Sequence, residues 1–198
     1  MKRGDVFQHL GSAAVVAVLI ALAVGSTDSG GKDSPGGGRQ SAVTPSPSLA
    51  PGEQWMYSQS EDPMAKGTTY SAAVQSTNTV DFDFPYGGSQ HAELTLRTHP
   101  RFGKDVIFRI ERGQLLCNSY DGCNVLIRFD DGQAQTFSAS GPSDNSTETL
   151  FIRNYSRFVA GMLKAERVRI SPQVYQEGSP VFEFDVRGFD VSRYRPAR

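Results

Sequence analysis

Residues 106–132 read VIFRIERGQLLCNSYDGCNVLIRFDDG, and this stretch decides the fold class. At its start the apolar side chains of Val106, Phe108 and Ile110 stand two residues apart, with Arg109 between the last two. Near its end, residues 125–129 repeat this spacing. A period of two is typical of β-strands that bury one face. The stretch therefore predicts two such strands.

Three glycines mark the turns of the same stretch. Gly113, Gly122 and Gly132 follow Arg112, Asp121 and Asp131, and each pair lies between or beside alternating runs. Glycine supplies the positive φ angle that tight hairpin turns require. We therefore expect consecutive strands to be antiparallel neighbours.

Alternation continues on both sides of this stretch, in residues 93–97, 168–170 and 182–187. In residues 80–86 it predicts that Val80, Phe82, Phe84 and Tyr86 share one buried side.

Residues 155–165 break the alternation. Phe158 and Met162 are four residues apart, as are Val159 and Leu163, which predicts an apolar stripe on a short helix, and Asn154 is a candidate N-cap. We predict a mainly β domain of antiparallel β-sandwich-like architecture, whose two sheets are closed at one side by this one short α-helix.

Cys117 and Cys123 flank a five-residue segment that contains the Asp121-Gly122 turn, so we expect them to face each other across a hairpin. In an oxidising compartment this spacing predicts a disulfide bond. The alternative is a redox or nucleophilic cysteine. Such a cysteine needs a neighbouring base, which the sequence near the pair does not offer.

The N-terminus indicates export. Lys2 and Arg3 precede an apolar run from Leu10 to Val24, which fits a signal peptide cleaved after Ala23 or, read as residues 6–25, a membrane anchor. In either case the rest of the chain lies outside the cytoplasm, and we expect a location in a bacterial cell envelope: anchored in the inner membrane and facing the periplasm, or periplasmic or secreted after cleavage.

The chain divides by composition into four parts. Residues 1–25 are the signal peptide or anchor, 26–54 a disordered linker rich in serine, glycine and proline, 55–190 one globular domain, and 191–198 a tail. With 38% hydrophobic residues, 21% charged residues and a formal net charge of -1, the composition gives no reason to expect a nucleic-acid partner.

Three polar side chains are candidates for recognition: Arg97, Arg128 and Asp130. An arginine at a strand end beside a hairpin carboxylate forms a suitable polar binding spot. His91 and His99 are eight residues apart, which is not the spacing of a zinc pair, and no EF-hand or Gly-x-Ser-x-Gly motif occurs. We expect no metal, no cofactor and no catalytic residue.

The domain resembles the VasI (TagO) family, which is associated with type VI secretion systems. The resemblance is carried by Trp55, residues 62–64, 94–97, 105–106, 127–130, 137–138 and 158–165, and the closing run 181–189. Where that family usually has a cysteine after the arginine that matches Arg97, this chain has Thr98. The resemblance implies an envelope accessory protein with no known reaction.

We expect a non-catalytic protein-interaction module that binds an envelope protein through an exposed strand edge or a loop face, in the role of a secretion-system accessory. One alternative is a lysozyme-inhibitor-like protein that presents the loop from Asn118 to Gly122. Another is an envelope enzyme, which would need His91, His99, Asp130 and Cys117 to converge.

Overall fold

The computed structural model describes residues 49–118 and 120–195 of the chain. Its strands are β1 (Met56–Asp62), β2 (Gly67–Gln75), β3 (Val80–Phe82), β4 (Gly88–Gln90), β5 (Ala92–His99), β6 (Gly103–Ile110), β7 (Cys123–Phe129), β8 (Gln135–Ser140), β9 (Thr149–Ile152), β10 (Arg167–Ser171) and β11 (Phe182–Asp185). Its helices are α1 (Tyr155–Met162) and α2 (Val191–Tyr194).

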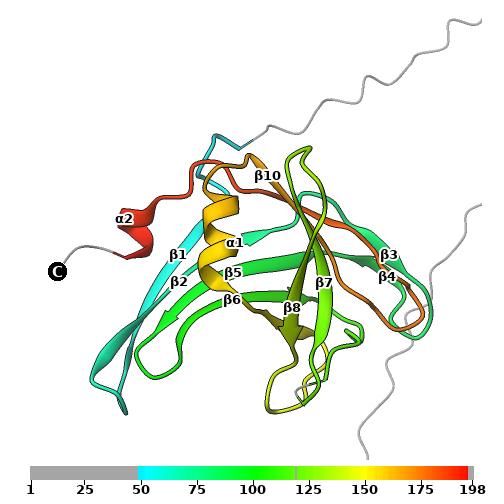
Figure 1. Ribbon diagram of the computed structural model, residues 1–198, viewed down its shortest axis with the longest axis horizontal. Coiled ribbons are helices and arrows are strands. Elements are labelled where there is room, and N and C mark those ends of the chain that lie inside the picture. Colours follow the sequence, from blue (N-terminus) through cyan, green and yellow to red (C-terminus); the bar gives the residue numbers. More distant parts are fainter. Residues whose placement is uncertain (1–48, 119, 196–198) are drawn as a thin grey trace, which may run out of the picture. The chain divides into compact units, whose positions relative to one another are not determined.

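Nine of these strands form one antiparallel sheet (Figure 1). The strand order is β1-β2-β5-β6-β9-β8-β7-β10-β11, and β3 and β4 pair separately as a small hairpin. The predicted mainly β, antiparallel fold is confirmed. Consecutive strands are neighbours at most hairpins, as the glycine turns predict, but β9 lies between β6 and β8 and separates β6 from β7.

The two halves of the sheet face each other across the core. Phe108 of β6 lies with its ring centroid 5.6 Å from that of Phe182 and 6.3 Å from that of Phe184, both on β11. These strands are far apart in the sheet order, so the sheet curves until its inward residues share one core. The curvature gives the sandwich-like arrangement from one continuous sheet rather than from two.

Helix α1 covers one opening of the curved sheet. Its Phe158 and Met162 are buried, and the Phe158 ring contacts those of Phe129 and Phe137 at 5.8 and 6.2 Å. The predicted helix is confirmed, but the described residues contain a second helix, α2, in the stretch predicted to be a tail. Asn154 is the N-cap residue of α1 as predicted, yet its backbone is left-handed with φ of 67° and its side chain makes no capping hydrogen bond.

The predicted burial of Phe84 is also wrong. Strand β3 ends at Phe82, which is buried, whereas Phe84 is 90% exposed in the turn that leads to β4. Pro85 has no backbone N–H to donate to a sheet ladder, so the strand ends before it. The alternation in the sequence therefore extends beyond the end of β3.

Ordered packing continues on either side of the predicted domain. Ahead of Trp55, the backbone of Gly52 touches Gly188 so closely that a Cβ atom on Gly188 would lie 2.5 Å from Gly52 N. After residue 190, helix α2 buries Tyr194, whose hydroxyl lies 2.9 Å from Thr98 Oγ1.

The predicted signal peptide or anchor, and the predicted linker as far as residue 48, lie outside the described residues. Within residues 49–118 and 120–195, neither helix has the length and apolar character needed to cross a membrane.

Candidate functional site: the outer edge of strand β1

Arg97 is paired within the sheet. From β5 its Nη2 and Nε atoms donate to Asp105 Oδ2 on the neighbouring strand β6, at 2.6 and 3.0 Å. Its guanidinium also lies 5.8 Å from the centroid of the Phe151 ring. These contacts fix the side chain to the outer face of the sheet.

Asp130 has a structural role at the end of β7. Its Oδ1 accepts hydrogen bonds from the backbone N–H groups of Glu166 and Arg167, at 2.9 and 2.8 Å. Arg128 lies near a different carboxylate, with Nη2 3.6 Å from Asp131 Oδ1. The structure does not bring Arg97 together with Arg128, because β6, β9 and β8 separate their strands.

The two histidines of the domain lie at opposite ends of β5. His91 precedes this strand, with Nδ1 3.4 Å from Ser76 Oγ, and His99 ends it, with Nε2 3.5 Å from Asp62 Oδ2. In the part of the chain that the structure describes, no group of three or more His, Cys, Asp or Glu side chains is arranged to hold a metal ion.

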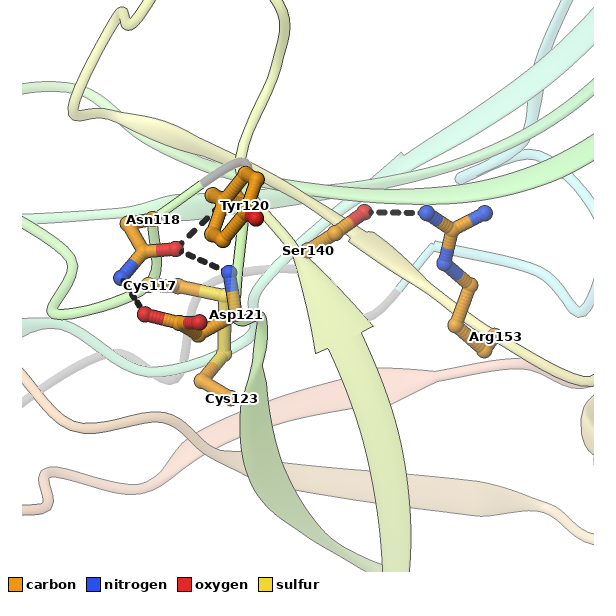
Figure 2. The surroundings of a disulfide bond; sticks show 7 residues. All are labelled: Cys117, Asn118, Tyr120, Asp121, Cys123, Ser140 and Arg153. Carbon is orange, nitrogen blue, oxygen red and sulfur yellow. Dashed lines mark hydrogen bonds between the residues drawn. A yellow bond between two sulfur atoms is a disulfide. The ribbon is translucent and has the colours of Figure 1, made fainter.

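The predicted disulfide bond between Cys117 and Cys123 is confirmed, with a Cα–Cα distance of 5.1 Å (Figure 2). Inside the loop, Asn118 Oδ1 accepts hydrogen bonds from the backbone N–H groups of Tyr120 and Asp121, at 2.9 and 2.6 Å. Tyr120 is 95% exposed at the tip. The disulfide bond and the Asn118 hydrogen bonds both constrain this loop, and the loop exposes the Tyr120 ring.

A cleft of about 440 Å³ lies beside this loop and is lined without charged side chains. Its walls are residues 114–118, Gly122, Gly141, Pro142 and residues 145–147.

Strand β11 lies at one end of the sheet, and the edge that does not pair with β10 is bonded by residues outside the sheet. The Glu183 carbonyl accepts the Thr77 N–H at 2.7 Å, and the Glu183 N–H donates to Asn78 Oδ1 at 2.8 Å. Asn78 Nδ2 donates to the Val181 carbonyl at 2.9 Å, and Gln54 Nε2 to that of Asp185 at 3.3 Å. Both outward backbone groups of Glu183 and the carbonyls of Val181 and Asp185 are therefore occupied.

At the other end of the sheet, the direction of each backbone group of β1 follows from β2. Ser76 directs its N–H to Ala92, on the β5 side, at 2.7 Å, and Thr77 directs its N–H to Glu183, on the opposite side, at 2.7 Å. Successive residues of a strand point their N–H and C=O groups to opposite sides. Counting back by twos, Ala73, Ser71, Thr69 and Gly67 point toward β1.

The partners of those four β2 residues are fixed by the register of the hairpin. They are Met56, Ser58, Ser60 and Asp62, which therefore hold the ladder to β2. The alternate residues Tyr57, Gln59 and Glu61 direct their backbone N–H and C=O groups outward.

This outer edge of β1 has no backbone partner within residues 49–118 and 120–195. Helix α2 covers only its beginning, where the Arg193 guanidinium lies 4.4 Å from the centroid of the Tyr57 ring and Tyr57 Oη accepts the Asp190 N–H at 2.7 Å. Gln59 and Glu61 are exposed. The strand contains no lysine or proline, which natural proteins often use to block a sheet edge.

The sequence analysis expected an exposed strand edge but did not identify β1 as that edge. The segment MYSQSED exposes both faces along most of its length, so it shows no apolar alternation. The segment also lacks lysine and proline, and this indicates an unblocked edge only once the strand is known to lie at the end of a sheet.

Comparison with known proteins gives little similarity. No family model matches the chain, and no curated protein matches it. Among solved structures, the crystal structure of invasion associated protein B from Bartonella henselae is similar, with a TM-score of 0.42 and 11% sequence identity, over 73% of this chain and 91% of that chain. The resemblance to the VasI family stays a prediction.

Proposed function

We propose that this chain is a non-catalytic interaction module of a bacterial cell envelope, exported or tethered to the membrane, that binds an extended segment of a partner protein along the outer edge of β1. The observation that carries the proposal is the set of outward backbone groups on Tyr57, Gln59 and Glu61. An extended segment that adds to a sheet edge gains main-chain hydrogen bonds from such groups.

The side chains around this edge favour a polar partner strand. Ser58, Ser60 and Gln59 are small or uncharged and exposed, and Glu61 adds one negative charge near the end of the strand. Serine side chains leave room for an approaching backbone. We infer a partner segment about as long as β1 that carries a cationic residue opposite Glu61.

The partner class rests on sequence expectations. The apolar N-terminal run supports a partner in the envelope, and the resemblance to the VasI family favours an accessory role in a secretion system.

Proline at position 59 tests the proposal. Proline is tolerated at an edge strand but removes the outward N–H, so Gln59→Pro should abolish partner binding while Gln59→Ala, which keeps that N–H, should not. Tagged full-length chains would be recovered from detergent-solubilised envelopes and their partners quantified by mass spectrometry against an untagged control.

Two outcomes separate the possibilities. A protein enriched by the wild type and by Gln59→Ala, but about tenfold less by Gln59→Pro, supports strand addition. Equal enrichment by all three proteins contradicts it. Ser60→Pro serves as a folding control, because the N–H of Ser60 belongs to the ladder with β2 and its loss should destabilise the domain.

A second candidate function is inhibition of an envelope enzyme such as lysozyme. The observation that favours it is Tyr120, which stands exposed on the loop closed by the disulfide bond. A rigid aromatic side chain is a common anchor in a partner's pocket. Inhibition by the wild type that weakens at least tenfold in Tyr120→Ala would support this function, and equal activity of lysozyme with and without the protein would exclude it.

A further inference from the structure

Two hairpin turns lie side by side at one end of the sheet and expose apolar side chains. Residues 63–66 join β1 to β2, and residues 100–102 join β5 to β6, so both turns lie at the same end of adjoining hairpins (Figure 1). A Cβ atom on Gly67 would lie 2.8 Å from Pro100 Cβ, which shows how closely the turns pack. Met64 is 78% exposed and Phe102 is 64% exposed.

Asp62 holds the two turns together. Its Oδ1 accepts hydrogen bonds from the backbone N–H groups of Met64 and Ala65 at 2.8 and 3.2 Å, and its Oδ2 accepts one from Arg101 Nε at 2.8 Å. The Asp62 side chain is 5% exposed. Both turns are thereby fixed. The Phe102 ring also packs against His99, with their centroids 4.5 Å apart, and both Met64 and Phe102 stay exposed.

The groups around Asp62 keep its carboxyl group ionised. Burial opposes ionisation of this carboxyl, but the N–H of Met64 and then the Arg101 guanidinium outweigh burial and hold its pKa below the usual value. The carboxylate is therefore ionised at neutral pH and offsets the charge of Arg101.

The exposed surface around the turns carries a small excess of positive charge. Lys66, Arg101 and Lys104 are all exposed. The Arg101 guanidinium lies 5.1 Å from the centroid of the Phe102 ring, and Lys104 Nζ lies 5.6 Å from that of the Tyr155 ring on helix α1. Within residues 61–67 and 99–104, Glu61 is the one exposed carboxylate, since Asp62 is buried. Apolar tips beside cations on long aliphatic stems are the chemistry of an interfacial anchor.

We propose that these two turns form a contact site for an anionic lipid surface. Met64 and Phe102 enter the headgroup region, and Lys66 and Lys104 bind lipid phosphates. A hollow of about 510 Å³ lies at the first turn, but neither Met64 nor Phe102 is among the residues that line it. Both side chains are exposed, and a bilayer surface accommodates such exposed apolar tips. This proposal is independent of strand addition at the edge of β1, because the two sites use different residues.

The chain length permits this contact. From Met56 to Asp62 strand β1 rises roughly 20 Å away from the end at which the preceding chain enters. A flexible chain as long as residues 26–48 has a root-mean-square span of roughly 26 Å. A domain tethered by the predicted anchor could therefore turn this end toward the same membrane.

A polarity-sensitive fluorophore on the full-length chain tests the proposal without interference from the N-terminal segment. The label would be attached at Met64→Cys, or at Phe84→Cys as the matched control, since Phe84 is 90% exposed on the β3–β4 turn. With vesicles containing phosphatidylglycerol, emission should shift to the blue at position 64 and not at position 84. With phosphatidylcholine vesicles the shift at position 64 should be much smaller.

Charge variants then identify the cations. The double variant Lys66→Gln, Lys104→Gln should lower the ratio of lipid-bound to unbound turns about 25-fold, at about fivefold for each charge removed. The control double variant Lys164→Gln, Arg112→Gln should leave this ratio unchanged. Phe102→Ser should reduce the shift at position 64 as well. Identical emission at positions 64 and 84 with anionic vesicles, or a shift that the paired lysine variant does not alter, would overturn the proposal.

Discussion

The two edge strands of the nine-stranded sheet, β1 and β11, differ in how far the rest of the chain bonds their outward backbone groups. At β11 both outward groups of Glu183 and the carbonyl of Asp185 are bonded, by Thr77, Asn78 and Gln54. On β1 the outward groups of Gln59 and Glu61 meet no backbone partner in the described residues. Both strands lie along the same side of β2, with β11 bonded at Thr77 just beyond the point where β1 begins. The difference teaches that closing a sheet edge needs groups from outside the ladder. Within residues 49–118 and 120–195 such groups line β11, whereas on β1 helix α2 covers only the beginning, beside Tyr57.

The largest expected difference between the two edges is in stability. Phe182→Ala should lower the free energy of unfolding by about 3–5 kcal/mol, because Phe182 is fully buried against Phe108. Met56→Ala on the open edge should cost less than about 0.5 kcal/mol, because Met56 is exposed. Urea unfolding of the oxidised protein measures both, and equal losses would show that β1 is as firmly packed as β11.

A smaller effect is expected where the β11 edge is capped. Asn78→Ala removes two hydrogen bonds, to the Val181 carbonyl and from the Glu183 N–H, and should lower the free energy of unfolding by about 1–3 kcal/mol. Gln59→Ala is the counterpart on the open edge and should change it by less than about 0.5 kcal/mol. The same unfolding experiment compares them, and an unchanged Asn78→Ala would mean that the cap is dispensable.

Acidity should act on the open edge through Asp62, which ends β1. Because the pKa of this carboxyl is lowered in the folded protein, its contribution to stability is present above the ordinary carboxyl pKa of about 4 and is lost as pH falls through the folded pKa. The difference in unfolding free energy between the wild type and Asp62→Asn should stay constant from about pH 7 to 5 and shrink below about pH 4. A difference that does not vary with pH would contradict the role of the ionised carboxylate.

The smallest expected effect is a difference in amide hydrogen exchange between neighbouring residues of β1, measured without any substitution. Amide hydrogens of Gln59 and Glu61 should exchange with solvent much faster than those of Ser58 and Ser60, which donate to β2. Exchange followed by NMR on the free protein would measure this alternation. Equal protection of all four amides would mean that another part of the chain covers the edge.

The sequence predicts well the elements that bury one face of a strand. Val125 and Ile127 of β7, and Phe182 and Phe184 of β11, alternate with polar residues, and all four are buried as predicted. Gly122 has the expected positive φ of 75°, and a Cβ atom there would lie 2.6 Å from the Ala139 carbonyl oxygen. Alternation and turn chemistry are local properties, so they can be read from neighbouring residues.

The candidate site could not be predicted in the same way. Whether β1 has a free edge depends on which strands occupy the ends of the sheet, and this is set by contacts such as that of Thr77 with Glu183, 106 residues apart. Asp62 shows the same limit, because its partner Arg101 is 39 residues away. Arg97 and Asp130 satisfied the local criteria for recognition, yet their partners Asp105 and Arg167 lie on neighbouring strands that the pattern does not identify.

The close contact of Gly52 with Gly188 has a mechanical consequence. A pulling force on the chain ahead of residue 50 would first load this contact and the bond from Gln54 Nε2 to the Arg187 carbonyl, at 2.8 Å, before it reached the ladder between β1 and β2. Side chains larger than hydrogen at either glycine would push the two backbones apart and transfer that tension to Met56. The small residues thus shield the hydrogen-bonding edge of β1 from strain that arrives along the N-terminal chain.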